Sequence, residues 1–132
     1  MHTITLSTQT RFQFLEITSE IQRIVQEVRL VSGLVCVYTP HTTAAITINE
    51  NADPDVVHDM KLWFQKTIPQ LQTGFRHGEG NSDSHIMASL VGTSETIIVE
   101  KGQLVLGTWQ GIYFCEFDGP RTRKVHIKCM AG

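Results

Sequence analysis

Short runs in which every second residue is apolar recur along most of this chain, and turn residues separate them. A period of two is typical of strands with one buried face. The pattern predicts strands at 4–6, 12–17, 33–39, 44–49, 95–100, 103–107, 110–117 and 123–130. The polar residues 7–10 predict a hairpin between the first two strands, and the apolar pair 33–39 and 44–49 is expected at the sheet centre. Apolar groups lie on both faces of 110–117, so this strand is expected to be buried on both sides, whereas 123–130 keeps one wet face.

Three segments have the period of a helix instead. Ser19 and Gln22 form a capping box, apolar residues follow at helical spacing, and Gly33 supplies the stop. Asp53 is an N-cap followed by Pro54, which predicts a second helix to about residue 66. Its expected buried stripe is Val56, Val57, Met60 and Phe64. A third helix is expected from 84 to 92, after a polar connection, 67–83, whose length makes it a candidate for function.

The length of 132 residues and an apolar content of 41% predict one domain, 1–132, that folds without metal or disulfides. Any metal would therefore be functional. The formal charge of −2, with scattered basic residues, excludes the basic surface of a nucleic-acid-binding protein. No apolar run approaches the ~20 residues of a membrane span. The N-terminus has no signal-peptide pattern, so a cytoplasmic protein is expected.

The cysteine count supports the same compartment. Cys36, Cys115 and Cys129 form no CxxC pair, and each lies in an apolar, strand-like run. We therefore interpret all three as reduced core residues.

Three of the six histidines, His41, His77 and His85, lie in polar breaks between strong elements. On one continuous helix His77 and His85 would be ~12 Å apart, but the glycines between them let the chain fold back. His41 follows a central strand, where ligands are often presented. Three imidazoles and an open water position are typical of catalytic zinc, so the set predicts a zinc or other transition-metal site. The alternative is that these are ordinary loop histidines, solvated or bonded to backbone.

Other side chains are candidates for roles around such a site. Glu79 and Glu50 are candidate acid/base residues, with solvated loop or turn positions as the alternative. Asp83 is a candidate carboxylate beside the metal ligands or a helix cap. Trp109, in a turn between glycines, is a candidate surface for stacking a ligand or a cap on the core. Arg121 is a candidate phosphate or carboxylate contact or a surface arginine. The motifs GxxxxGK[ST], GxGxxG and GxSxG are absent, so P-loop, dinucleotide and common serine-hydrolase functions are excluded.

Taken together, four runs resemble the YjbQ family: HTTA at 41–44, NENADP at 49–54, EGNSDSH at 79–85, and GTWQG at 107–111 with DGPR at 118–121. The resemblance covers nearly the whole chain. It implies an α+β single domain with a mostly antiparallel sheet of seven to eight strands and three helices, assembled as a homotrimer. It also implies a site that unites the three histidines around a metal. The activity it implies is that of a secondary thiamine-phosphate synthase, which joins a pyrimidine diphosphate to a thiazole phosphate.

Three functions therefore compete. The first is a thiamine-phosphate synthase-type transferase acting on a small phosphorylated substrate. The second is a metal-dependent hydrolase of a small metabolite, and the third is a non-catalytic trimer that binds a metal or small ligand. A three-histidine set suits zinc or another transition metal better than magnesium, which the chemistry of pyrophosphate release normally uses.

Overall fold

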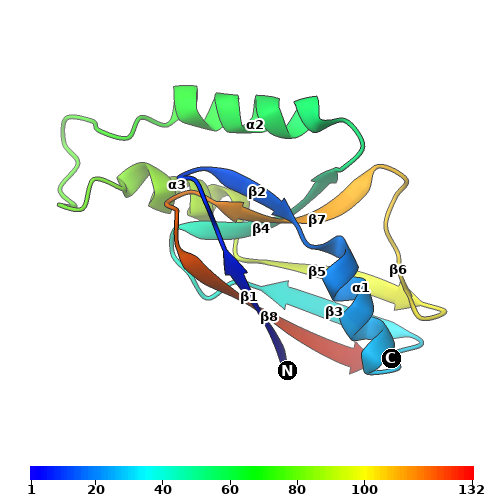
Figure 1. Cartoon of the computed structure of the whole chain (residues 1–132). Helices are drawn as coiled ribbons and strands as arrows, with labels where there is room; N and C mark the ends of the chain where they lie inside the picture. Colours follow the sequence, from blue (N-terminus) through cyan, green and yellow to red (C-terminus); the bar gives the residue numbers. More distant parts are fainter.

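The computed structural model describes residues 1 to 132 and contains eight strands and three helices (Figure 1). The strands are β1 (His2–Ser7), β2 (Gln13–Glu16), β3 (Gly33–Tyr38), β4 (Ala44–Glu50), β5 (Ser94–Glu100), β6 (Gln103–Leu104), β7 (Gln110–Glu116) and β8 (Thr122–Ala131). The helices are α1 (Thr18–Glu27), α2 (Pro54–Thr67) and α3 (Ser82–Val91). These elements confirm the predicted α+β class.

The strands form two antiparallel sheets, with the orders β1-β8-β3-β5-β6 and β2-β7-β4. Two predicted pairings are wrong. β1 and β2 form no hairpin, because β1 pairs with β8 and β2 pairs with β7. β3 and β4 do not pair: β3 is the central strand of the five-stranded sheet, as expected, whereas β4 is an edge of the other sheet. Apolar alternation specifies the face that a side chain occupies but not the strand that lies beside it.

The three-stranded sheet is the middle layer of the molecule, and its central strand β7 is buried on both faces as predicted. Ile112 and Phe114 point into the cluster between the two sheets, which α1 also joins. Tyr113 and Cys115 point to the opposite face, into a second cluster that contains Met87 of α3. Period-two alternation therefore supplies two cores from a single strand.

The predicted capping box of the first helix is wrong. α1 begins at Thr18, and no side chain caps it. The side chain of Gln22 instead bonds the β5–β6 turn, donating to the Gly102 carbonyl at 3.0 Å and accepting from the Leu104 amide at 3.0 Å. Gly33 does not end the helix, which stops at Glu27. Gly33 instead begins β3, where an added Cβ would lie 2.0 Å from the Met130 carbonyl oxygen. The glycine is needed because β8 approaches β3 so closely at this point.

α2 confirms its predicted start, because the Asp53 carboxylate accepts from the Asp55 amide at 2.9 Å and Pro54 opens the helix. The predicted stripe of Val56, Val57, Met60 and Phe64 is half-buried rather than buried, since no residue of α2 is fully buried. Val57 and Phe64 pack only partly against the second cluster. In Figure 1, α2 runs along the outside of the molecule, on the side of the three-stranded sheet that faces away from the five-stranded sheet.

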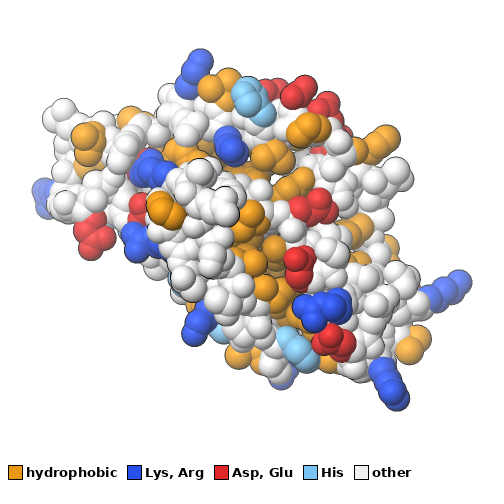
Figure 2. All heavy atoms as spheres, in the orientation of Figure 1, with side chains coloured by type: hydrophobic (Ala, Val, Ile, Leu, Met, Phe, Trp, Pro, Cys, Tyr) orange, Lys and Arg blue, Asp and Glu red, His pale blue; other side chains and the backbone are white.

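Apolar side chains remain exposed on several elements. They include Leu62 and Trp63 on α2, and Leu34, Ile98 and Met130 on the outer face of the five-stranded sheet. Figure 2 shows a band of apolar side chains running down the middle of the face below α2.

No helix in the chain combines the length and the apolar character needed to cross a membrane. All three cysteines are free thiols. Cys115 is fully buried, and this burial raises the pKa of its thiol, whereas Cys36 and Cys129 are only partly buried.

Candidate functional site

His77 and His85 lie side by side where the 68–81 connection meets α3. Their ring centroids are 5.4 Å apart and the ring planes are perpendicular. Gly80, at φ 73°, reverses the chain between them in a conformation that glycine adopts without strain. The carboxylate of Glu79 joins the pair, with Oε2 3.7 Å from Nε2 of His77, and both side chains are exposed. The loop therefore brings together two imidazoles and one carboxylate that a straight helix would separate.

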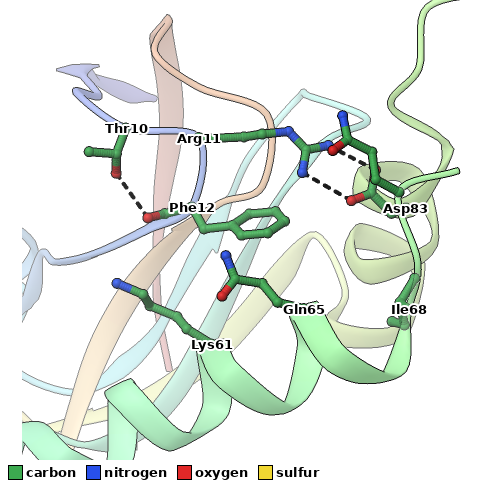
Figure 3. A pocket seen from close by; sticks show the side chains of 8 residues that line it. Thr10, Arg11, Phe12, Lys61, Gln65, Ile68 and Asp83 are labelled. Atoms are coloured by element: carbon green, nitrogen blue, oxygen red, sulfur yellow. Dashed lines mark hydrogen bonds and ion pairs between the residues drawn. The ribbon is translucent and has the colours of Figure 1, made fainter.

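Two pockets border the 68–81 connection. His77 lines the smaller one, of about 340 Å³, together with Gln70, Phe75 and Ser82. The larger, of about 700 Å³, lies between α2 and the 10–12 segment (Figure 3). Its lining residues are Thr10, Arg11, Phe12, Lys61, Gln65, Ile68, Gln70 and Asp83. Because Gln70 lines both, the two pockets are neighbours.

The structure does not bring His41 into this pair. His41 lies between β3 and β4, and its Nε2 accepts a hydrogen bond from the Lys124 backbone amide at 2.9 Å. Partial burial, followed by the nearby positive charge of Arg123, lowers the pKa of His41. The neutral ring that results carries its proton on Nδ1, so neither nitrogen keeps a lone pair free for a metal ion. Nowhere in the chain do three His, Cys, Asp or Glu side chains gather closely enough to hold a metal ion, so one chain does not assemble the three-histidine set.

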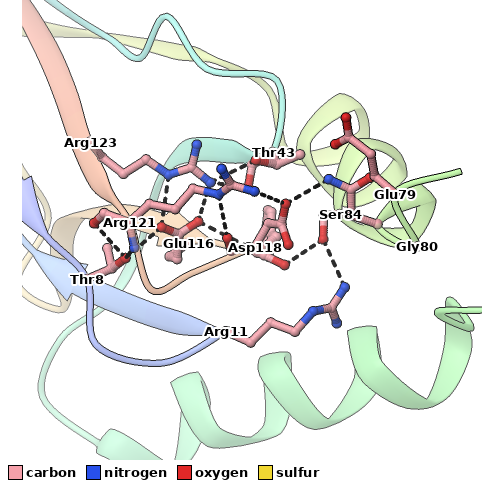
Figure 4. Close-up of polar contacts among 12 residues, drawn as sticks. Thr8, Arg11, Thr43, Glu79, Gly80, Ser84, Glu116, Asp118, Arg121 and Arg123 are labelled. Carbon is pink, nitrogen blue, oxygen red and sulfur yellow. Dashed lines mark hydrogen bonds and ion pairs between the residues drawn. The ribbon is translucent and has the colours of Figure 1, made fainter. Parts of the chain in front are cut away.

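A buried ion pair between β7 and β8 (Figure 4) carries the charges that act on His41. Glu116 is fully buried and Arg123 is 4% exposed. The Arg123 guanidinium donates to both carboxylate oxygens of Glu116, through Nε at 2.9 Å and through Nη2. Glu116 also accepts from the Thr8 hydroxyl at 2.7 Å, and Arg123 donates to the Thr43 hydroxyl at 2.8 Å. This network joins β7, β8 and two loops, so it fixes the end of the molecule on which the histidines lie.

Arg121 is tied to Asp118 at the same end. Its Nε donates to the Asp118 carbonyl at 2.8 Å and its Nη2 to the carboxylate at 2.9 Å. Asn81, just before α3, donates from Nδ2 to the same carboxylate at 2.7 Å, while its Oδ1 is buried without a hydrogen-bond partner. The Arg121 side chain is half exposed, so its outer N–H groups remain available to an anion.

Asp83 forms an ion pair, which differs from its predicted roles as a helix cap or a carboxylate beside the metal. Its two oxygens accept from the Arg11 guanidinium at 2.8 and 3.1 Å. Arg11 also donates to the Ser84 hydroxyl at 3.2 Å, and that hydroxyl donates to the Phe117 carbonyl at 2.6 Å. The start of α3 is thereby fixed to the segment between β1 and β2.

Glu50 and Trp109 lie together, but at the other end of the three-stranded sheet. The Asn51 amide donates to the Trp109 carbonyl at 2.9 Å, and Glu50 accepts from the Asp53 amide at 3.2 Å just before α2. Trp109 is 62% exposed. Tyr113 donates to the Glu50 carbonyl at 2.9 Å, and burial, followed by the charges of Glu16 and Glu50, raises the pKa of the phenol.

Two groups of predicted site residues are therefore separated within one chain. β4 pairs with β7 from Ala44, opposite Glu116, to Glu50, opposite Gln110. Six residues at the rise of a strand span about 20 Å. One group, His77, Glu79, His85 and Arg121, belongs to the end where α3 begins, and the other, Glu50 and Trp109, to the opposite end.

Sequence reasoning missed Glu116, Arg123 and Arg11. For the first two a signal existed: Arg123 is in phase with buried Val125, and Glu116 stands between the buried Cys115 and Phe117. A charged residue in a buried phase predicts a buried partner of opposite charge. For Arg11 no such signal exists, because its partner Asp83 is 72 residues away.

The molecule is thus an α+β protein of two antiparallel sheets and three helices, with a histidine pair at one end of its middle layer. The family model described as UPF0047 protein YjbQ-like matches residues 2–132. The chain belongs to this family, which confirms the resemblance.

Relatives and solved structures agree with this membership. UPF0047 protein YugU of Bacillus subtilis is 52% identical over 98% of this chain and 98% of the relative. UPF0047 protein YjbQ of Escherichia coli O157:H7 is 39% identical over 86% and 84%. The crystal structure of an uncharacterized protein of the YjbQ/UPF0047 family from Clostridium acetobutylicum has a TM-score of 0.96 at 50% identity, covering 98% and 100% of the two chains. A YbjQ-like protein of unknown function from Sulfolobus solfataricus has a TM-score of 0.94 at 28% identity, covering 99% and 96%.

Proposed function

We propose that this protein is an enzyme acting on a small, phosphorylated metabolite, with His77, His85 and Glu79 as its reaction centre. One observation carries the proposal: two perpendicular imidazoles lie 5.4 Å apart beside a carboxylate, and one of them, His77, lines a pocket of about 340 Å³. Imidazole is the side chain best suited to proton transfer near neutral pH.

The pair supplies both halves of acid–base chemistry. One ring takes a proton from an attacking group while the other returns a proton to the leaving group. Glu79 distinguishes the two rings, because a small side-chain rotation brings its carboxylate into hydrogen-bond distance of His77. Arg121 is the nearby cation proposed to contact the substrate's phosphate, through the N–H groups that Asp118 leaves free.

The specific reaction we propose is of the thiamine-phosphate synthase type, which the family resemblance implies. The alternatives are hydrolysis of a small metabolite and ligand binding without turnover. The deciding assay follows the joining of a pyrimidine diphosphate to a thiazole phosphate, beside a panel of phosphate esters and lactones. His77→Ala and His85→Ala should each lower turnover by roughly 10²–10⁴-fold. The control is His58→Ala, an exposed α2 histidine that lines neither pocket. Equal rates in all variants on every substrate would reject the enzyme and favour ligand binding.

A divalent metal held by the same pair is the alternative to direct proton transfer, because an imidazole nitrogen that binds a metal cannot also take up a proton. Zinc or another transition metal is preferred to magnesium. His77 and His85 would supply two nitrogen donors, and the remaining ligands would have to come from outside this pair, since no third His, Cys, Asp or Glu of the chain completes the set. This donor set suits zinc, whereas magnesium prefers oxygen ligands. His41 does not fit the set, because its Nε2 is bonded to the Lys124 amide.

We propose further that the protein is a homotrimer in which one chain's Glu50 and Trp109 approach the histidine pair of the next. Two observations support this: the two ends of the β4–β7 ladder, near which the two groups lie, are about 20 Å apart in one chain, and Trp109 is largely exposed. A closed ring joins unlike surfaces head to tail, so it brings opposite ends of neighbouring copies together.

The test of assembly is sedimentation of the wild-type chain together with tryptophan fluorescence of a Trp63→Phe variant, in which Trp109 is the only indole. A trimer mass and a blue-shifted emission that moves to the red on dilution are expected. A monomer mass at micromolar concentration would reject the assembly.

A further inference from the structure

The pocket of about 700 Å³ between α2 and the 10–12 segment has no role in the chemistry proposed for the histidine pair. Small-molecule sites in proteins measure roughly 300–1,000 Å³. The pocket is therefore large enough for an organic molecule, and it would hold a bare inorganic anion only loosely.

The side chains that line this pocket carry a net positive charge. Asp83 is the one carboxylate in the lining, its side chain is 2% exposed, and both of its oxygens are held by Arg11. Lys61 is half-buried and makes neither a hydrogen bond nor an ion pair within the chain. In Figure 3 its side chain extends from α2 toward the segment that carries Thr10 and Phe12. The Arg11–Asp83 pair is neutral, so the ammonium of Lys61 gives the wall one uncompensated positive charge.

An apolar surface lies beside this charge. The Arg11 guanidinium carbon is 4.8 Å from the centroid of the Phe12 ring, which holds the ring in place. In Figure 3 the ring lies between the Arg11 guanidinium and the Gln65 amide. Ile68, 8% exposed, adds aliphatic surface, and the Gln65 amide has no hydrogen-bond partner in the chain. The pocket thus combines one free cation, one free amide and a fixed aromatic ring.

We propose that this pocket binds a small organic anion, with its phosphate or carboxylate group on Lys61 and its apolar part against Phe12 and Ile68. The proposal is independent of the reaction centre, because neither His77 nor His85 lines this pocket. Gln70 lines both pockets, so an anion bound here lies next to the histidine site.

The first experiment titrates the full-length protein with phenyl phosphate, benzoate and the uncharged benzyl alcohol, and follows backbone and side-chain amide NMR signals. One of the two anions should give saturable shifts at residues 10–12 and at the Gln65 side chain. Tighter binding of phenyl phosphate identifies a phosphate ligand, and tighter binding of benzoate identifies a carboxylate. Equal binding of benzyl alcohol, shifts confined to other residues, or no saturation at millimolar concentration would each overturn the proposal.

The second experiment compares Lys61→Met with Lys66→Met, an exposed lysine on the same helix that lines neither pocket. Hydrogen bonds to a charged group contribute about 1.5–3 kcal/mol, so Lys61→Met should raise the Kd roughly ten- to hundredfold. Lys66→Met and His77→Ala should leave the Kd unchanged. Equal weakening by both lysine variants would indicate general surface charge and would overturn the proposal. If the Kd of the anion is unchanged in His77→Ala, the pocket is a site separate from the proposed reaction centre. This result stands whether or not His77→Ala lowers turnover.

Discussion

Replacing Arg123 with methionine removes the cation from a carboxylate that no water reaches. Glu116 is fully buried, and Arg123 supplies two of its hydrogen bonds. After the substitution only the Thr8 hydroxyl, at 2.7 Å, and the Asp118 amide, at 3.1 Å, still donate to the carboxylate. A carboxylate left buried without its cation destabilises a fold by about 3–5 kcal/mol. The variant should lose that much free energy of unfolding, a large part of the total for a domain of this size.

Urea unfolding followed by circular dichroism measures the loss, and Lys124→Met is the matched control. Lys124 is the next residue of β8 and its side chain is exposed, so its substitution should change the free energy of unfolding by less than about 0.5 kcal/mol. The double variant Glu116→Gln with Arg123→Met removes both charges and should recover part of the loss, which the double-mutant cycle reports as coupling. A loss below about 1 kcal/mol for Arg123→Met, or a double variant whose loss is the sum of the single losses, would refute the reasoning.

Three further predictions test other parts of the molecule. First, folding lowers the pKa of His41 below its ordinary 6.5, so its neutral form stabilises the fold above that pH. This contribution should vanish as the pH falls through the pKa of the folded state. Urea unfolding across this range should show a steeper loss of unfolding free energy in the wild type than in His41→Gln. Second, elemental analysis should find about one transition-metal ion per chain, and His77→Ala and His85→Ala should lower this content while His41→Ala should not. An unchanged metal content in all three variants would exclude the histidine pair as ligands. Third, Gly33→Ala should lose at least about 1–3 kcal/mol of unfolding free energy, because the added Cβ clashes with the neighbouring strand. Gly78→Ala is the control, since an added Cβ there meets open space. Equal losses in the two variants would show that the clash at Gly33 is not the cause.

Local sequence signals predicted most of the elements but not their pairing. Asp53 and Pro54 start α2 as expected, because an N-cap depends on residues a few positions apart. The approach of His77 to His85 is equally local, since glycines between them permit the turn. Strand pairing is different, because the ladder bonds are made by backbone groups that all residues share. The one sequence signal for the two-sheet arrangement is the presence of apolar residues on both faces of β7.

Long-range contacts limited the prediction of the site in the same way. The sequence around His41 is that of an ordinary loop, yet the hydrogen bond that commits its Nε2 comes from Lys124, 83 residues away. Glu50 ends β4 and Trp109 precedes β7, and nothing in their local sequence reveals that they lie at the opposite end of the sheet from His41. Residue type thus predicted which side chains are candidates for a site. The direction of the strands determines which of these side chains lie at the same end of the three-stranded sheet.

The position of α2 connects the proposed anion pocket to the stability of the fold. A helix of 14 residues with no fully buried side chain is marginal by itself, so α2 depends on contacts near its C-terminal half, above all Phe64 against Phe117 at 5.8 Å and the buried Ile68. Lys61 and Gln65 lie one turn apart on the side of α2 that lines the pocket. An anion held there adds contacts to the least buried helix of the chain, so it should slow amide hydrogen exchange in α2 more than in β7, whose side chains are already buried.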